Sequence, residues 1–200
     1  MMKRTRGLTL IELLVALAVM GVLIAVTAPS FRSLFEVQRL RGINAQLVTD
    51  LQFARNEAVA RGVPLRVVFR SSASATCYAL FTSAGTPLQA ANALRCDCLS
   101  GPGNACNGIA GATEVRTVSV PLSQGVSIYP VDGIAAFGFD PVTGGLLTIP
   151  IDQISAPLPA FRVSSQLDSS RVFYNVLNQA GRTTVCSPAG TAMGEAPCPP

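Results

Sequence analysis

The stretch RGLTLIELLVALAVMGVLIAVTAP, residues 6–29, decides the fold of this chain. It is almost entirely apolar, and its single acidic residue, Glu12, stands near its start. Residues 8–28 would span about 31 Å as a helix, which is enough to cross the hydrocarbon core of a bilayer. Three basic residues precede residues 8–28, and this asymmetry predicts a cytoplasmic N-terminus followed by an exported remainder: Lys3, Arg4 and Arg6.

Three interpretations of this N-terminal segment are open. A plain transmembrane anchor accounts for its length but not for Glu12. A cleaved secretory signal would end at the small residues 26–28, although the apolar region is long for such a signal and Pro29 would follow the cut. The third interpretation explains the acid. Residues 7–13, GLTLIEL, resemble the class III signal of type IV pilins and type II secretion pseudopilins.

This resemblance implies a processing site and an assembly residue. In that family a membrane peptidase cuts after the glycine, here Gly7, and methylates the new N-terminus, here Leu8, where most members have Phe. Residues 1–7 would then be the prepilin leader. In the filament, the Glu12 carboxylate would neutralise the N-terminal amine of a neighbouring subunit, because a charge in an apolar bundle is tolerated only when it is paired. Such pairing would favour one axial register, as a lone polar residue does in a coiled coil.

Beyond Pro29 the helical pattern continues but becomes amphipathic. Pro29 removes a backbone donor and should kink the helix, and Gly62, shortly before Pro64, predicts its end. We therefore expect a transmembrane half over 8–28 and an amphipathic half over 29–62. The apolar face of the second half repeats at intervals of three or four residues: Leu40, Ile43, Leu47, Leu51, Ala54 and Ala58.

The remaining residues, 63–200, predict a β-rich head. β-branched residues punctuated by Gly and Pro favour an antiparallel sheet. The predicted fold class is therefore α+β, with a long N-terminal helix packed against an antiparallel head. The expected strands are 65–69, 77–82, 114–120, 126–129, 136–139, 146–149, 161–163, 172–177 and 183–186.

An even number of cysteines beyond an export signal predicts disulfides. There are six: Cys77, Cys96, Cys98, Cys106, Cys186 and Cys198. We favour a bridge between the last two, which would hold the C-terminal tail, and two bridges of open pairing among the other four. These would fasten the long Gly- and Ala-rich stretch 83–112. Zinc is the competing interpretation for the first four cysteines, although the C-x-C spacing is tighter than usual in zinc sites.

The composition argues against catalysis and against strong attraction to polyanions. Histidine is absent, which removes Ser-His and Cys-His chemistry. The net charge of +4 falls to about +1 when the three basic residues of the leader are removed. We expect no enzyme activity, metal or cofactor. The scattered aspartates are interpreted as turn caps: Asp132, Asp140, Asp152 and Asp168.

Several pieces of the chain, from the end of the long helix through the head, resemble the GspH/FimT family, in the family's order. They are 51–58 with 63–67, 120–128, 137–141 with Gly144, and Gly181-Arg182. The resemblance implies a structural minor pilin or pseudopilin of a type IV pilus or type II secretion system, acting at the start or tip of assembly. Its partners would be other pilins and the prepilin peptidase. It would lie in the bacterial inner membrane with a periplasmic head before joining the filament.

DNA uptake is the alternative function. Some FimT-type minor pilins bind DNA through a C-terminal G-R-x-R motif. Gly181 and Arg182 match this motif, whereas Thr184 replaces its second arginine. One missing phosphate contact weakens binding, unless Arg162 and Arg171 lie close enough to compensate. Arg182 is therefore the predicted DNA contact of this alternative.

Overall fold

The computed structural model describes residues 9–83, 96–131, 133–148, 160–188 and 194–198. The chain divides into two compact units, Met1–Gln38 and Arg39–Pro200. One helix, α1 (Leu10–Arg61), begins in the first unit and ends in the second. The strands of the described residues all belong to the second unit, so the α+β class with an N-terminal helix is confirmed.

Helix α1 ends where the sequence predicted. Gly62 takes a φ of 65°, and its N–H donates to the carbonyl of Val59 at 3.3 Å. A left-handed glycine of this kind is a common helix terminator. The helix continues through Pro29, so the proline does not end it, and the kink stays a prediction.

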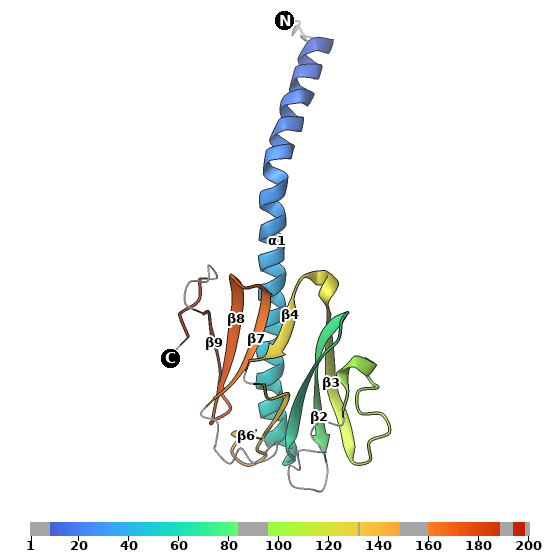
Figure 1. Ribbon diagram of the computed structural model, residues 1–200, viewed down its shortest axis with the longest axis vertical. Helices are drawn as coiled ribbons and strands as arrows, with labels where there is room; N and C mark the ends of the chain where they lie inside the picture. Colours follow the sequence, from blue (N-terminus) through green and yellow to red (C-terminus); the bar gives the residue numbers. More distant parts are fainter. Residues whose placement is uncertain (1–8, 84–95, 132, 149–159, 189–193, 199–200) are drawn as a thin grey trace, which may run out of the picture. The chain divides into compact units, whose positions relative to one another are not determined.

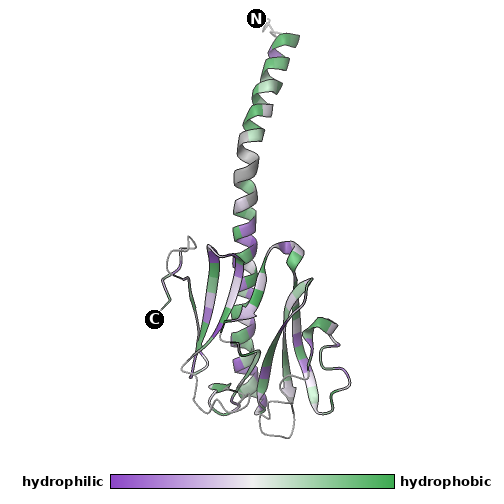
Figure 2. Ribbon diagram, viewed as in Figure 1, coloured by the Kyte–Doolittle hydropathy of each residue, from purple (hydrophilic) through white to green (hydrophobic). Residues whose placement is uncertain are grey.

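In the first unit the described side chains of α1 are mostly apolar and, apart from the half-buried Val37, exposed. Every residue from 10 to 25 is exposed, and Figure 2 shows this half of the helix predominantly in the hydrophobic colour. Leu10 is 77% exposed and Ile24 62%. Within the described part of the chain, no helix reaches the combination of length and hydropathy expected of a membrane span.

The head consists of two antiparallel sheets, which Figure 1 shows alongside the C-terminal half of α1. Sheet A has the order β3-β2-β1-β5-β6, and sheet B the order β4-β7-β8-β9. The strands of sheet A are β1 (Leu65–Ser71), β2 (Ala75–Ser83), β3 (Ala112–Pro121), β5 (Ala136–Phe139) and β6 (Leu146–Thr148). Those of sheet B are β4 (Ser127–Pro130), β7 (Ala160–Asp168), β8 (Arg171–Asn178) and β9 (Thr183–Cys186).

Each expected strand is present, but the prediction for β7 was too short. It covered 161–163, whereas β7 continues to Asp168. The added residues are polar, and Ser164, Ser165 and Gln166 pair with both β4 and β8. The hydrophobic pattern therefore predicted too short a strand, because residues 164–166 are kept in the strand by backbone pairing with β4 and β8 and not by apolar side chains.

The core lies between α1 and the two sheets. On the helix, the predicted apolar face is buried, with Ile43 half-buried and the others fully so: Leu40, Leu47, Leu51, Ala54 and Ala58. An aromatic cluster joins the sheets. The ring centroid of Phe137 on β5 lies 4.5 Å from that of Phe161 on β7, and Phe69 on β1 stacks at 6.2 Å from Phe137. The two sheets thus share one core.

The six cysteines form three disulfides: Cys77–Cys98, Cys96–Cys106 and Cys186–Cys198. The favoured C-terminal bridge and the two bridges among the first four cysteines are confirmed. These four thiols are therefore not available to zinc. The first two bridges are buried with Val68, Ala79 and Phe81 on one face of sheet A, so they hold the described part of the 83–112 stretch against that sheet.

A charged residue lies in the interior of the head. Arg66, on the central strand β1, is fully buried, and its three guanidinium nitrogens have no hydrogen-bond partner among the described residues. Burial lowers the pKa of this guanidinium. Burying a charge costs free energy, so other contacts of sheet A must offset the burial of Arg66.

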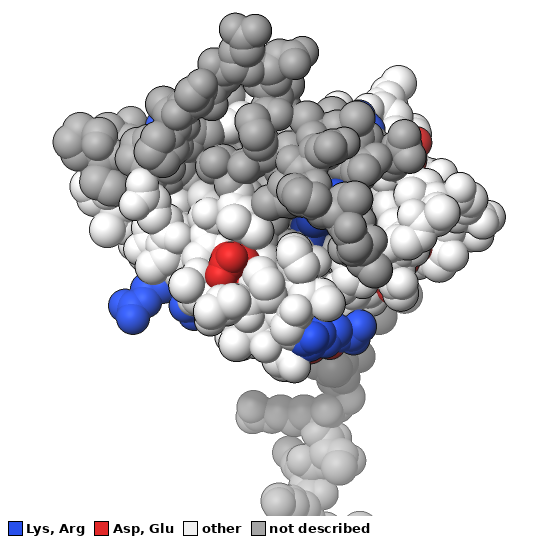
Figure 3. Space-filling view, turned by 90° about the horizontal axis from the view of Figure 1, so that it is seen from below, with Lys and Arg blue, Asp and Glu red and all other residues white. Residues whose placement is uncertain are grey.

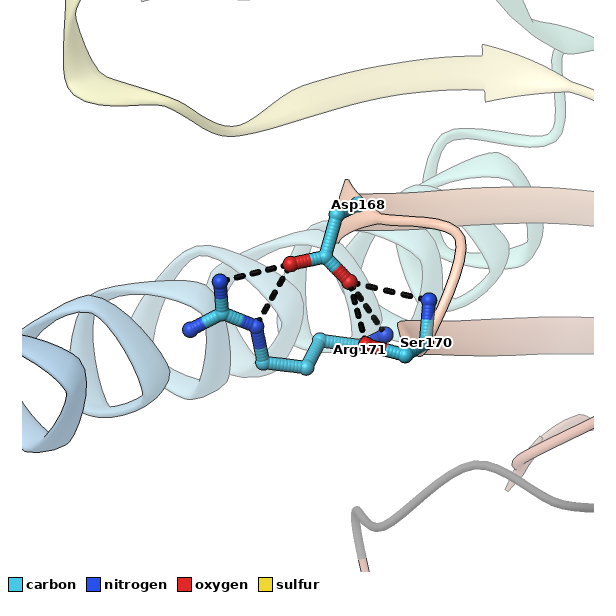
Figure 4. A network of polar contacts seen from close by, with 3 residues as sticks. All are labelled: Asp168, Ser170 and Arg171. Atoms are coloured by element: carbon cyan, nitrogen blue, oxygen red, sulfur yellow. Dashed lines mark hydrogen bonds and ion pairs between the residues drawn. The ribbon is translucent and has the colours of Figure 1, made fainter.

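The turn between β7 and β8 is held by a single carboxylate (Figure 4). One oxygen of Asp168 accepts hydrogen bonds from the Ser170 hydroxyl at 2.7 Å and from the backbone N–H groups of Ser170 and Arg171 at 2.9 Å each. The other oxygen accepts from Arg171 Nε at 2.7 Å. The Ser170 hydroxyl, followed by the Arg171 side chain, holds the pKa of Asp168 well below its usual range. Asp168 is thus a turn cap, as predicted.

This depressed pKa predicts an acid-sensitive hairpin. The ionised Asp168 carboxylate stabilises the folded protein fully above the ordinary carboxyl pKa of about 4. This stabilisation is lost as the pH falls from that value through the lower pKa that Asp168 has in the folded protein. Asp168→Asn should therefore unfold more easily than the parent at neutral pH, and the difference should narrow below about pH 4. Urea unfolding at a series of pH values measures this. A difference that stays constant with pH would contradict it.

Candidate functional site

The acidic residue of the apolar segment caps its own helix. Glu12 Oε2 accepts hydrogen bonds from the backbone N–H and the hydroxyl of Thr9, each at 2.9 Å. The Glu12 N–H in turn donates to Thr9 Oγ1 at 3.3 Å. Because α1 begins at Leu10, Thr9 occupies the N-cap and Glu12 the third helical position. This reciprocal pair is a capping box, which satisfies two backbone donors at the helix start.

The sequence prediction for Glu12 did not include this cap. The signal was present, since T-x-x-E directly before an apolar run is the sequence pattern of a capping box. The Glu12 carboxylate is exposed and bonds only to a residue of its own helix start among the described residues, so a group from another molecule can reach it. Gly7 and Leu8, the predicted cleavage and methylation residues, lie outside the described residues.

Two buried polar contacts join α1 to the sheets. The first is to sheet A. Asp50, fully buried on the helix, accepts a hydrogen bond from the Tyr78 hydroxyl on β2 at 2.7 Å and forms an ion pair with Arg116 on β3. The Arg116 guanidinium also lies 5.3 Å from the ring centroid of Phe53. Burial, followed by the hydrogen bond to Asp50, raises the pKa of Tyr78 well above its usual range.

The second polar contact is to sheet B. Asn44 Oδ1 accepts hydrogen bonds from Ser165 Oγ on β7 at 2.6 Å and from Asn175 Nδ2 on β8 at 2.8 Å. All three side chains are buried. Because buried polar groups must find specific partners, Asn44 and Asp50 together set the axial position of α1 against both sheets.

The turn before β9 contains the predicted DNA contact. Gly181 is buried at a φ of 71°, and a Cβ there would lie 2.2 Å from the Gly144 carbonyl oxygen. Arg55 on α1 donates from Nε to the same oxygen at 3.0 Å. Glycine at 181 is therefore explained by local packing. The next residue, Arg182, is exposed, and its backbone N–H donates to Asn178 Oδ1 at 3.0 Å.

A pocket of about 390 Å³ opens beside this turn, and we refer to it as the β9 pocket. Its wall comes from α1 on one side and from the start of β9 on the other. None of its lining residues is acidic. They are Gln52, Arg55, Asn56, Gly181, Arg182, Thr183 and Thr184.

The arginines that might have compensated for Thr184 do not line this pocket. Arg171 is paired with Asp168 at the opposite end of β8. Arg162 on β7 is in register with Val176, which is in register with Thr184, so two strand spacings, about 10 Å, separate Arg162 from Thr184. On the described surface visible in Figure 3, basic side chains stand at separate places and do not form one continuous patch.

A methylation-type helix start followed by a β-rich head defines the class of protein, a pilin-like subunit. Residues 2–28 match the family model of the prokaryotic N-terminal methylation motif. Residues 44–192 match that of the type II transport protein GspH, so the chain belongs to the GspH family. Comparisons with curated proteins and with solved structures gave no match.

Family membership confirms the resemblance read from the sequence. The chain is a minor pseudopilin of the type found in type II secretion and type IV pilus systems. The family is structural and not a family of enzymes, and its members assemble with other pilins or pseudopilins. The methylation motif indicates membrane anchoring.

Proposed function

We propose that this chain is cleaved between Gly7 and Leu8 by a prepilin peptidase, methylated at Leu8 and built into a filament of pilins or pseudopilins. Residues 8–28 anchor it in the inner membrane before assembly, with the N-terminus cytoplasmic and residues 63–200 periplasmic. The same residues then enter the apolar filament core. The head helps to start assembly or stands at the filament tip.

The observation that carries this proposal is the position of Glu12. The described residues on its C-terminal side expose large apolar side chains that no part of the described chain covers, as at Leu13, Leu14 and Leu17. Such a surface is stable only in lipid or against other helices. Glu12 stands at the start of this surface, where the capping box with Thr9 satisfies its carboxylate until a neighbouring amine approaches. In an apolar core, that amine needs a counter-charge.

Two variants separate helix capping from charge pairing. Glu12→Gln keeps a side chain that can serve in a capping box but removes the charge. Thr9→Ala removes the hydroxyl of the cap but keeps the charge. Each full-length variant is expressed in a host that carries the filament-assembly machinery but lacks its own copy of this subunit. Mass spectrometry reads the mature N-terminus, and immunoblotting of sheared filaments measures incorporation.

We expect methylated Leu8 in the parent and in both variants. Incorporation of Glu12→Gln should fall about tenfold or more, because an unpaired amine is left in the core. Thr9→Ala should stay near the parent. Equal incorporation of Glu12→Gln and parent would contradict the role of Glu12. An intact Met1, or a cut after Ala28, would contradict the processing step.

A further inference from the structure

The β9 pocket presents donors that the fold itself does not use. The Arg182 guanidinium has no ion-pair partner among the described residues, and the Arg55 side chain donates from Nε to the Gly144 carbonyl oxygen. The Thr183 hydroxyl oxygen is buried and has no hydrogen-bond partner in the described part of the chain. Two guanidinium groups and a hydroxyl thus border a concave space without a negative charge.

This donor set fits a carboxylate. Guanidinium groups bind carboxylates through two parallel hydrogen bonds, and charge-assisted bonds of this kind are stronger than neutral ones. Among the described residues, β9 is an edge strand of sheet B that pairs with β8 alone. A partner's side chain can reach the pocket that opens between α1 and the start of β9.

We propose that the β9 pocket receives an acidic side chain from the head of a neighbouring filament subunit, with Arg182 as its principal partner. This inference rests on the proposed function, because it requires that the chain stand beside other pilin-like heads. It adds the surface through which the head recognises its neighbour.

The geometry favours a single acidic side chain over DNA. A nucleic acid is held by several phosphate contacts along its backbone, and its affinity depends on their number. Here Thr184 adds no charge, Arg171 is paired elsewhere and Arg162 is two strands away. Of these candidates only Arg182, with Arg55 beside it, borders the pocket, and this pair of guanidinium groups suits one carboxylate better than a run of phosphates.

Site-specific photo-crosslinking tests this proposal. A benzophenone amino acid replaces Asn56, an exposed residue of the pocket wall, in the full-length chain, and filaments are irradiated in cells. The same chain is prepared with Arg182→Glu and, as a matched control, with Arg162→Glu. Arg162, on β7, is exposed like Arg182, so the control makes the same charge change outside the pocket.

We expect an adduct whose peptide, identified by mass spectrometry, lies in the head of another pilin-like subunit and contains Asp or Glu. Its yield should fall about tenfold or more with Arg182→Glu and stay near the parent with Arg162→Glu. Changing the identified acid to Arg should restore the adduct of Arg182→Glu. Equal yields in all three chains, a nuclease-sensitive adduct with DNA, or no adduct in filaments that contain the chain would each overturn the proposal.

The outcomes that would overturn the pocket proposal can be distinguished from those that would overturn the proposed function. If the pocket proposal alone is wrong, the parent chain is still present in sheared filaments and the incorporation of Glu12→Gln is still lower by about tenfold or more. If the chain is absent from filaments, the proposed function is wrong, and the pocket proposal is wrong with it.

Discussion

Replacing Asp50 with alanine is expected to lower the free energy of unfolding by about 3 kcal/mol. The variant leaves the Tyr78 hydroxyl buried without an acceptor and removes the partner of Arg116. The Arg116 side chain is 46% exposed, so water screens part of the lost ion pair, and most of the effect should come from Tyr78. Chemical unfolding of the full-length chain in detergent, followed by circular dichroism, measures the change.

Two companion variants show which interaction is lost. Asp50→Asn keeps an oxygen that can accept a hydrogen bond from the Tyr78 hydroxyl, so its free energy of unfolding should fall less than that of the alanine variant. Glu57→Ala removes a carboxylate from an exposed i,i+4 pair with Arg61 and should cost about 0.5 kcal/mol or less. A loss for Asp50→Ala as small as that for Glu57→Ala would refute a structural role for the Asp50 contacts.

Replacing Gly181 with alanine should cost about 3 kcal/mol, from two separate causes. A φ of 71° is unfavourable for any residue with a Cβ, and the new atom would lie 2.2 Å from the Gly144 carbonyl oxygen. Since Arg55 bonds to the same oxygen, the turn, the Arg55 contact and the β9 pocket should all be disturbed together. Thermal unfolding measures the loss.

Gly62 provides the matched control for this prediction. Its φ is 65°, but a Cβ there would meet nothing within 4 Å. Gly62→Ala should therefore show the backbone cost alone, about 1 kcal/mol. If the two alanine variants lost equal stability, the close approach of residues 181 and 144 would have no energetic weight.

Local patterns in the sequence were sufficient for most of the fold. The interval of three or four residues predicted the buried face of α1, and Gly62 predicted its end. β-branched runs between turn residues located each strand, and the cysteines near the C-terminus were correctly paired. At the helix start, the sequence around Glu12 identified the N-terminal methylation motif, and the T-x-x-E pattern contained the helix cap as well.

Other features depended on contacts between distant residues. Asp50 reads as an ordinary polar position of an amphipathic helix, yet it is fully buried because Tyr78 and Arg116 reach it from two strands. Ser165 and Asn175 are polar and are not predicted to be buried from the sequence, yet both are fully buried in the head. Arg66 reads as an exposed residue of an alternating strand, yet it is fully buried.

The sequence by itself determined that this chain has a pilin-like helix start, an α+β fold and a head tied by disulfides, because periodicity, turn residues and a short motif are local properties of a chain. The tertiary structure decided which cysteines pair in the first two bridges and how Asn44 and Asp50 hold the helix to both sheets. It also decided that Arg55 and Arg182 meet at one pocket. These pairings join residues far apart in the chain, and packing in three dimensions selects them.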